Sequence, residues 1–450
     1  KTRGDVPEPA TPDRADWYGW ARYGSATRPW LDWEDVSAGA APADPVPVRA
    51  TDPLYILYTS GTTGRPKGVV RDTGGYAVAL VWSMRHIYNV DPANCPQPVI
   101  WTTSDIGWVM GHSYIVYGPL LAGATTVMFE GAPVDTPDAG AYWRLLERYR
   151  VAVLYTSPSA LRAIRKADPA GELLAGRDLS ALRTVFSAGE SLDPSTYHWT
   201  LELLRRPVVD HWWQTETGWP AFANPLGLQT LPVKPGSAGV PVPGFRPRVL
   251  DGGGNRLPVG VEGNLVLGLP LPPGTLTGLW RDPQRYRSEY LAAFPGHYAT
   301  GDTGYFDDDG YLFVLGRSDD VINVAGHRMS TGTMEAVLAA HPAVADCAVI
   351  GVHDELTGQR PSGYVVCKAG VDVDEHRLAA ELVAAVRDRI GAIAALRTVT
   401  VVAALPRTRS GMILRKTMRQ IVSGEPYTVP PTIEDPAVLE SFARAVRTGS

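Results

Sequence analysis

The segment TSGTTGRPKG, residues 59–68, gathers residue types that can hold an anion. Its three glycines leave backbone N–H groups accessible, its four Thr and Ser residues add hydroxyl groups, and Lys67 adds a positive charge. It is not the common P-loop, because proline precedes the lysine and glycine follows it. The segment therefore predicts an anion-binding loop between a strand and a helix, with a flexible Gly/Thr hairpin as the alternative.

A second candidate is DHWWQTETG, residues 210–218, at the end of a predicted strand. The hydroxyl group of Thr215 can bond a phosphoryl oxygen, and the carboxylate of Glu216 can hold Mg²⁺ on a polyphosphate. Trp212 and Trp213 are large, rigid side chains that could shorten a pocket. Taken alone, the segment could instead be the tryptophan-rich edge of a core.

Acidic and basic side chains recur in predicted loops around short strands near residues 298–330; they are Asp302, Arg317, Asp319 and Arg328. An aspartate at a strand end can bind the two hydroxyls of a ribose, and arginine suits phosphate because it forms paired hydrogen bonds. The FDDDG stretch is interpreted as a solvated turn, since the spacing of a calcium loop is missing. His112 could act as a base, but we favour local packing for an isolated histidine.

Strand and helix patterns alternate from residue 54 onward and would position these side chains. Apolar β-type runs precede helical patterns at 75–90, 112–121, 138–149, 158–167 and 193–205. This alternation predicts a largely parallel sheet with helices on both faces. Such sheets bind ligands beyond the carboxyl ends of their strands, so the loops after ILYT, VFSAG and VVDHWW are the expected site.

The remaining sequence predicts two further units. Short strands separated by Gly and Pro from 234 to 315 predict an antiparallel subdomain. Helices at 331–340 and 375–390, with strands between and after them, predict a small α+β unit. The fold class is thus α/β, with a large domain at 1–317, a small mobile C-terminal domain at 318–423, and a solvated tail at 424–450 that ends in a helix.

Composition narrows the class of protein. A net charge of −5 predicts neither nucleic acid nor membrane as a partner, and no apolar run approaches the roughly 20 residues of a membrane span. The N-terminus is polar and unlike a secretory signal. Cys95, Cys347 and Cys367 share no metal-ligand spacing and fit reduced thiols in a cytoplasmic protein. Motifs of serine hydrolases, Rossmann dehydrogenases and zincins are missing from the sequence.

The sequence resembles the adenylate-forming superfamily of acyl-CoA synthetases, adenylation domains and luciferases. The resemblance rests on six motifs in this order: YTSGTTGRPKG, AGE, WWQTETG, TGD, GRSDDVINVAGHR and PRTRSGMILRK. The resemblance spans residues 58–416 and is strongest for short-chain members, the propionyl-CoA and acetyl-CoA synthetases. It implies ATP, Mg²⁺ and coenzyme A, and two half-reactions. A carboxylate attacks the α-phosphate of ATP to give an acyl-adenylate; the small domain then rotates, and the CoA thiol displaces AMP.

The resemblance also assigns roles by position. The pyrophosphate end of ATP would contact Thr59, Ser60, Gly61, Thr62, Thr63, Gly64 and Lys67. The adenine site would be lined by Gly189, Glu190 and Asp210, with Trp212 and Gln214 among the cofactor-binding residues. Thr215 would contact the α-phosphate, and Glu216 would hold Mg²⁺. Asp302 and Arg317 would bind the ribose hydroxyls, and Arg328 would bind the phosphates. Asp319 would be the hinge, and Gly326 would border the pantetheine tunnel. Arg387 would contact the nucleotide part of CoA.

The same resemblance places Trp108, Val109, Ala188 and Trp213 around the acyl group. Trp213 would form a floor that excludes medium chains, and Ala188, where acetate enzymes have the bulkier Val, leaves room for a further methylene. Because one methylene discriminates by only ~1–3 kcal/mol, propionate over acetate is a preference. An amino-acid-activating domain is disfavoured, since it would need an aspartate for the substrate amino group.

Two departures from the family pattern matter. The family has Lys at the catalytic position of Met412, where it bridges carboxylate and α-phosphate oxygens. Loss of one such aimed group commonly costs ~10²–10³ in rate, so we expect impaired adenylation and a retained thioester-forming step. That Lys is a regulatory acetylation target in related synthetases, so an acetyltransferase or deacetylase would be a partner of the Lys-containing form.

The second departure is that most of the family's N-terminal subdomain, which precedes the phosphate loop, is absent. We expect a preceding segment or a partner chain to cover the sheet surface left open. Both departures favour a competing hypothesis from another class: a non-catalytic module that holds nucleotide or acyl-adenylate without making it.

Overall fold

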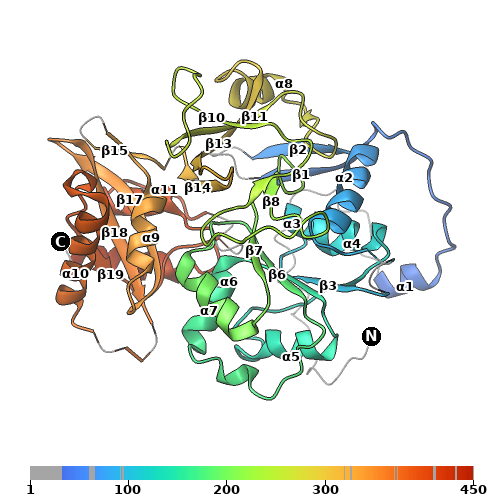
Figure 1. Ribbon diagram of the computed structural model, residues 1–450, viewed down its shortest axis with the longest axis horizontal. Helices are drawn as coiled ribbons and strands as arrows, with labels where there is room; N and C mark the ends of the chain where they lie inside the picture. Colours follow the sequence, from blue (N-terminus) through green and yellow to red (C-terminus); the bar gives the residue numbers. More distant parts are fainter. Residues whose placement is uncertain are drawn as a thin grey trace, which may run out of the picture. The chain divides into compact units, whose positions relative to one another are not determined.

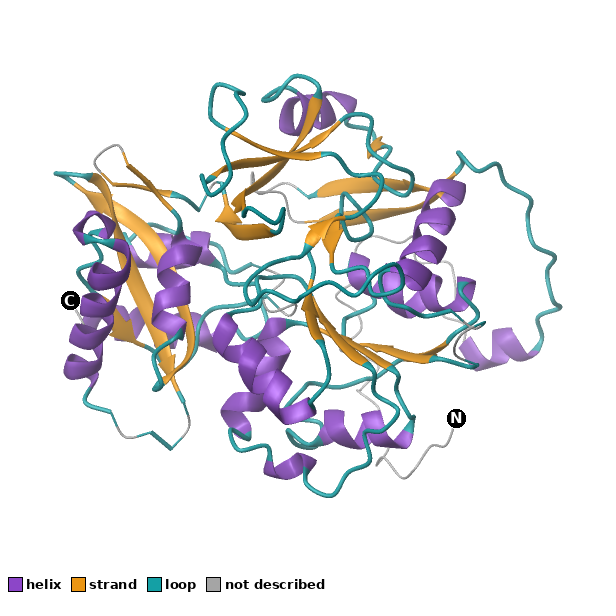
Figure 2. Ribbon diagram, viewed as in Figure 1, coloured by secondary structure: helices purple, strands orange, loops and turns teal. Residues whose placement is uncertain are grey.

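The computed structural model describes residues 33–59, 66–91, 93, 96–318, 320–324, 327–368, 370–371, 373–408, 412–430 and 433–448. Residues 1–48 and 49–450 form separate units, and each is described by itself. The described part of the first unit contains helix α1 (Trp33–Ala38). The elements that follow belong to the second unit; Figure 1 labels the elements and Figure 2 distinguishes helices from strands.

Five short strands form the parallel sheet that the alternating pattern predicts, in the order β4-β3-β5-β6-β7. The strands are β3 (Val99–Thr102), β4 (Thr125–Val127), β5 (Val153–Thr156), β6 (Thr184–Ser187) and β7 (Val208–Asp210). The accompanying helices are α2 (Thr73–His86), α3 (Val109–Gly111), η2 (His112–Tyr117), α4 (Gly118–Leu121), α5 (Ala141–Arg148), α6 (Pro158–Ala167), η3 (Glu172–Leu174) and α7 (Pro194–Leu204).

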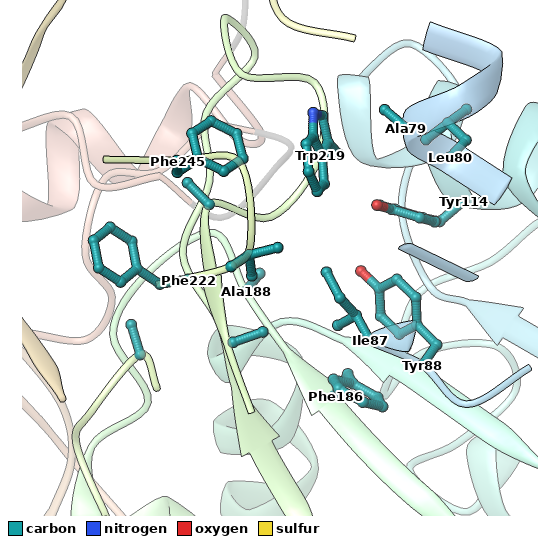
Figure 3. Packing of buried hydrophobic residues seen from close by; sticks show 14 of the residues in the cluster. Ala79, Leu80, Ile87, Tyr88, Tyr114, Phe186, Ala188, Trp219, Phe222 and Phe245 are labelled. Carbon is teal, nitrogen blue, oxygen red and sulfur yellow. The ribbon is translucent and has the colours of Figure 1, made fainter. Parts of the chain in front are cut away.

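Both faces of this sheet are apolar, because successive side chains of a strand point to opposite faces. On one face, Ile100 and Phe186 pack into a core shared with α2 and η2. On the other, Trp101 and Val185 pack against α5, α6 and α7. Figure 3 shows part of the first core. Helices on both faces leave the carboxyl edge of the sheet as the place where a site can form.

The other strands before residue 318 pair antiparallel. One sheet has the order β10-β11-β13-β14, formed by β10 (Pro247–Leu250), β11 (Gly263–Gly268), β13 (His297–Phe306) and β14 (Leu312–Arg317). The smaller sheets are formed by β1 (Pro53–Thr59), β2 (Lys67–Asp72) and β12 (Gly278–Leu279), and by β8 (Phe222–Ala223) and β9 (Val240–Pro241). Helices α8 (Pro283–Tyr286) and η4 (Arg287–Leu291) precede β13.

The pairing of β1 with β2 corrects one prediction. The segment 59–68 was predicted between a strand and a helix, but β1 pairs antiparallel with β2, and Thr59 lies opposite Lys67. The connection therefore closes a hairpin outside the parallel sheet, and α2 begins only at Thr73. The physical reason is that KGVVRD buries Val69 and Arg71 on one face of an extended strand. Residues 60–65 lie outside the described residues.

The described residues from 322 to 448 form an α+β sandwich around a five-stranded sheet, β16-β15-β18-β17 with β19 beside β18. Val349 faces α9 and α10, whereas its neighbour Ile350 faces α11 and α12. The strands are β15 (Ile322–Val324), β16 (His327–Met329), β17 (Val344–Asp354), β18 (Gly358–Cys367) and β19 (Val399–Val401). The helices are α9 (Thr331–Ala339), α10 (Glu375–Ile390), η5 (Ala392–Ala394), α11 (Arg415–Val422) and α12 (Ala437–Thr448).

Helix α12 corrects the prediction of a solvated tail. Leu439 and Phe442 are buried, and the Phe442 ring centroid lies 4.9 Å from that of Tyr364 in β18. The last helix thus closes one face of the core around β17 and β18. Among the described residues, no helix is both long and apolar enough to cross a bilayer.

Candidate functional site

The carboxyl ends of β6 and β7 lie side by side, with Ser187 opposite Asp210. The loop after β6 carries Gly189 and Glu190, and the loop after β7 carries residues 211–218. Gly189 has a φ of +103°, which favours glycine, and a Cβ built there would meet nothing within 4 Å. Three candidates for the adenine site are thereby brought to one open edge of the sheet.

Asp210 is buried and uses both carboxylate oxygens on the backbone. It accepts hydrogen bonds from the N–H groups of Leu192 at 2.9 Å and His211 at 3.1 Å. Burial raises the pKa of Asp210 well above its ordinary value in spite of these donors. Asp210 therefore orders the two loops at this edge.

His211, the next residue, also forms contacts at this edge of the sheet. Burial lowers its pKa to about 4, so the ring is neutral near pH 7. Its Nδ1 lies 2.5 Å from the carbonyl oxygen of Ser187, and its Nε2 lies 2.8 Å from the Tyr88 hydroxyl. A neutral ring satisfies both contacts when Nδ1–H donates and Nε2 accepts.

Glu216 forms a buried cluster with Lys67 of β2 and Tyr290 of η4. Lys67 Nζ lies 3.1 Å from Glu216 Oε1, and the Tyr290 hydroxyl donates to the same oxygen at 2.6 Å. Burial raises the pKa of Glu216, but the Lys67 charge and the hydrogen bonds from Tyr290 and Lys67 outweigh it and hold the pKa below its ordinary value. Lys67 and Glu216, which the sequence analysis placed at different parts of ATP, form one ion pair here.

Asp302 is the centre of a second buried cluster. It lies within β13, not in the predicted loop, because it pairs with Arg317 of β14 in the antiparallel register. Its carboxylate accepts hydrogen bonds from Arg317 Nη1 at 3.3 Å, Trp212 Nε1 at 3.2 Å and Gln214 Nε2 at 2.8 Å. Burial raises the pKa of Asp302 to about 6 against these donors. Segment 210–218 therefore connects the Asp302 cluster to the Glu216 cluster.

Glu190 is held by an arginine that the sequence analysis did not single out. Arg162 of α6 donates from Nη2 to Glu190 Oε2 at 2.6 Å and from Nη1 to Asp193 Oδ2 at 3.4 Å. Burial raises the pKa of Glu190, but the Arg162 and Arg407 charges outweigh it and hold the pKa below its ordinary value. Arg162 Nε also lies 3.8 Å from Asp346 Oδ1, which joins this cluster to β17.

Two of the four acyl-pocket candidates share a core. Ala188 and Tyr114 are buried in it, and Trp213 packs against it. Figure 3 labels Ala188 and Tyr114 among the side chains of this core. Trp213 is held in place because its Nε1 donates to the Tyr155 hydroxyl at 2.8 Å and its ring meets that of Tyr114 edge-on, with centroids 5.5 Å apart. Trp108 and Val109 lie at the start of α3.

The basic segment near the C-terminus folds back on itself, and Met412 is 56% exposed within it. The N–H group of Met412 donates to Thr408 Oγ1 at 3.1 Å, and Thr408 N–H donates to the Met412 carbonyl at 2.9 Å. Arg387 is an exposed residue of α10. Residues 60–64, Asp319 and Gly326, with the side chain of Arg328, lie outside the described residues.

Two buried hydroxyl groups lie next to candidate residues in the chain. Thr59 Oγ1 and Ser187 Oγ have no hydrogen-bond partner among the residues that the structure describes. Thr59 begins the candidate phosphate loop, and Ser187 immediately precedes Ala188. The charged groups of the site, the Lys67 and Arg317 cations and the Asp302 carboxylate, are donors and acceptors of the kinds that a nucleotide requires.

Several residues of this site escaped the sequence analysis, namely Arg71, Tyr155, Arg162 and Tyr290. Each acts on a motif that lies far away in the chain; Tyr290 and Glu216, for example, are 74 residues apart. Among them only Arg71 carries a signal in the sequence, because it directly follows the apolar pair Val69–Val70; its burial is seen only in the structure.

The sequence matches known protein families and known proteins. A family model described as AMP-binding enzyme matches residues 8–280, and one described as AMP-binding enzyme C-terminal domain matches residues 333–412. An uncharacterised protein of Pseudomonas aeruginosa is 54% identical to the chain, over 93% of the chain and 66% of that protein. The mitochondrial acyl-CoA synthetase short-chain family member 3 of Mus musculus is 51% identical, over 91% of the chain and 60% of that protein.

The fold is also similar to solved structures. The crystal structure of an anthranilate CoA ligase in complex with anthranoyl-AMP superposes with a TM-score of 0.76 at 25% identity, covering 87% of this chain and 72% of that one. The chain spans less than two thirds of the length of the curated relatives described above.

Proposed function

Because the chain belongs to the AMP-binding enzyme family, whose model matches residues 8–280, we propose that it makes a short-chain acyl-CoA through an acyl-adenylate. One observation carries the proposal. Segment 210–218 links the Lys67–Glu216 pair to the Asp302–Arg317 pair at the carboxyl edge of a parallel sheet. The names of relatives, an acyl-CoA synthetase and a ligase bound to anthranoyl-AMP, support the reaction class.

The Asp302 and Glu216 clusters divide the binding of ATP between them. Asp302, ionised above pH about 6, would accept hydrogen bonds from the ribose hydroxyls, with Arg317 beside it. Thr215 would donate its hydroxyl to an α-phosphate oxygen. Mg²⁺ held at Glu216 would neutralise phosphate charge as it develops. Lys67, which shares Glu216 Oε1 with Tyr290, would turn towards the pyrophosphate end.

The acyl pocket would take propionate. Ala188 is small, and Trp213 is fixed on two sides, by Tyr155 and by Tyr114, so that a longer chain would meet a rigid wall. Acetate is the alternative substrate, since the discrimination available from one methylene is only ~1–3 kcal/mol.

Met412 sets the expected level of activity. A thioether donates no hydrogen bond and carries no charge, so it would not bridge the carboxylate and the α-phosphate. We therefore propose that adenylation is impaired in this chain and that the thioester-forming step is retained. An acetyltransferase or deacetylase would act only on a form with Lys at position 412. The lack of a cation at position 412 also favours a second candidate function, a non-catalytic module that binds nucleotide or acyl-adenylate.

Three further residues complete the proposal, and two of them, Asp319 and Gly326, lie outside the described residues. Asp319 would be the hinge between a large domain at 1–317 and a small domain at 318–423. Gly326 would border the pantetheine tunnel, and Arg387, exposed on α10, would meet the nucleotide part of CoA. These assignments rest on the sequence motifs.

The test compares Met412→Lys with the parent chain and with Met412→Gln, a neutral control of similar length. Pyrophosphate exchange with acetate, propionate and butyrate reports adenylation, and CoA transfer from supplied propionyl-adenylate reports the second step. We expect exchange to rise by ~10²-fold or more in Met412→Lys only, since one aimed group is restored. Full exchange in the parent would contradict the role of position 412. Binding of MgATP without exchange in any variant would favour the non-catalytic module.

A further inference from the structure

Arg71 is a fully buried cation close to the proposed phosphate site. It lies in β2, and none of its surface is exposed to solvent. Among the described residues, no carboxylate forms an ion pair with it. Its charge is met by the ring of Tyr76, whose centroid lies 5.3 Å from Arg71 Cζ, and by backbone carbonyl groups. A buried charge is costly unless it is hydrogen-bonded, and both Nη groups of Arg71 are, whereas its Nε has no partner among the described residues.

Three carbonyl groups from two separate loops converge on the Arg71 guanidinium. Nη1 donates to the carbonyls of Glu216 at 3.1 Å and Gly274 at 2.8 Å, and Nη2 donates to the carbonyl of Thr215. The planar guanidinium fixes the directions of these bonds, which an ammonium group would not do. Thr215 and Glu216 are therefore tied by their backbone to β2.

The next residues of the turn are fitted to the same side chain. Gly218 has a φ of +77°, and a Cβ built there would lie 2.6 Å from Arg71 Cζ. The Gly218 carbonyl accepts a hydrogen bond from Ser113 Oγ at 2.7 Å, and Ser113 in turn bonds the Tyr76 hydroxyl at 2.6 Å. The turn thus closes over Arg71 and is held on its far side by η2.

The position of Arg71 in β2 connects the turn to the phosphate loop. Residues 67, 69 and 71 of a strand share one face, and Lys67 on that face reaches the Glu216 carboxylate while Arg71 reaches the Glu216 carbonyl. One strand therefore holds both the side chain and the backbone of Glu216. A displacement of the turn would move Thr215 and Glu216 relative to Lys67.

We propose that Arg71 is a positioning residue that fixes Thr215 and Glu216 for the α-phosphate and the metal ion of MgATP; this inference rests on the proposed function. Arg71 itself contacts no part of the nucleotide and acts through the backbone of the turn. Its removal should weaken contacts to the phosphates and leave the contacts of Asp302 with the ribose unchanged.

The experiment compares the full chain with Arg71→Met, Arg71→Lys and a matched control, Arg183→Met. Arg183 also donates to a backbone carbonyl, that of Asn89 at 3.1 Å, but lies directly before β6. Calorimetric titration measures the affinity for MgATP and for adenosine, thermal unfolding without ligand measures stability, and crystal structures give the distance between Lys67 Nζ and Glu216 Oε1.

We expect MgATP to bind at least tenfold more weakly to Arg71→Met, adenosine to bind within twofold of the parent, and the Lys67–Glu216 contact to lengthen. Arg71→Lys should lie between the two, since an ammonium group keeps the charge without the paired geometry. Arg183→Met should leave both affinities unchanged. If Arg71→Met does not fold, the Arg71→Lys comparison carries the test alone, with the same split between ligands.

Three outcomes would overturn the inference. The first is MgATP affinity within twofold of the parent, and the second is an unmoved Glu216 in the variant crystal. The third is an equal loss for MgATP and adenosine together with a lower unfolding temperature, which indicates a merely structural role. If the parent binds neither ligand, the proposed function fails instead, and the variant crystal structure still decides whether Arg71 positions Glu216.

Discussion

The pH dependence of stability provides a test of the Asp302 cluster that needs no ligand. The carboxylate is buried between Arg317, Trp212 and Gln214, and burial raises its pKa from the ordinary value of 3.8 to about 6. The folded state thus binds this proton more tightly than the unfolded state. Between pH 3.8 and 6 the folded chain carries more protons, so the unfolding free energy contributed by Asp302 falls as pH rises.

The magnitude follows from the size of this shift. Over the whole range the shift of about two pKa units corresponds to ~3 kcal/mol. Between pH 5 and pH 7.5 about one pKa unit is traversed, so Asp302 alone should lower the unfolding free energy by ~1.4 kcal/mol. The carboxylate is fully ionised in both states well above pH 6, and the dependence should level off there.

The assay is urea denaturation at intervals from pH 5 to pH 8 for the parent chain and for Asp302→Asn. Other groups titrate in both proteins, so the difference between the two curves isolates the Asp302 contribution. We expect this difference to change by ~1.4 kcal/mol between pH 5 and pH 7.5, mostly below pH 6, and to level off above it. A difference that is flat with pH, or one that changes with the opposite sign, would show that the donors around Asp302 outweigh its burial and would refute the reasoning.

Two further substitutions test the packing around segment 210–218. Gly218→Ala should destabilise the chain by at least ~1 kcal/mol because its backbone is left-handed, and by more in total because the new methyl group meets Arg71. Thermal unfolding measures the loss. Gly176→Ala is the control that separates the two causes, because Gly176 has a φ of +75° but open space around it. Tyr155→Phe removes the hydrogen bond that holds Trp213, so the ratio of butyrate to propionate activation should rise by up to ~10-fold in a Met412→Lys background, and an unchanged ratio would rule out this support.

Much of the scaffold could be predicted because its signals are local. The predicted helices at 158–167 and 375–390 match α6 and α10, since strong helical patterns bounded by Ser157 and Asp374 caps need no distant partner. The strands of the parallel sheet follow from short apolar runs in the same way. The hairpin between β1 and β2 was missed because a Gly-rich connection is compatible with either a following helix or a following strand.

For the candidate site, too, the sequence predicts what is local and the tertiary structure decides which residues pair. Glu216, Asp302 and Lys67 could be predicted as site residues from the sequence, because carboxylates, hydroxyls and cations beside predicted strand ends are few. Tertiary structure alone decided that Lys67 pairs with Glu216, that Arg71 ties down a turn 145 residues away, and that Trp213 is locked by Tyr155. These pairings depend on how strands and turns meet across a folded core, and neither periodicity nor composition carries that information.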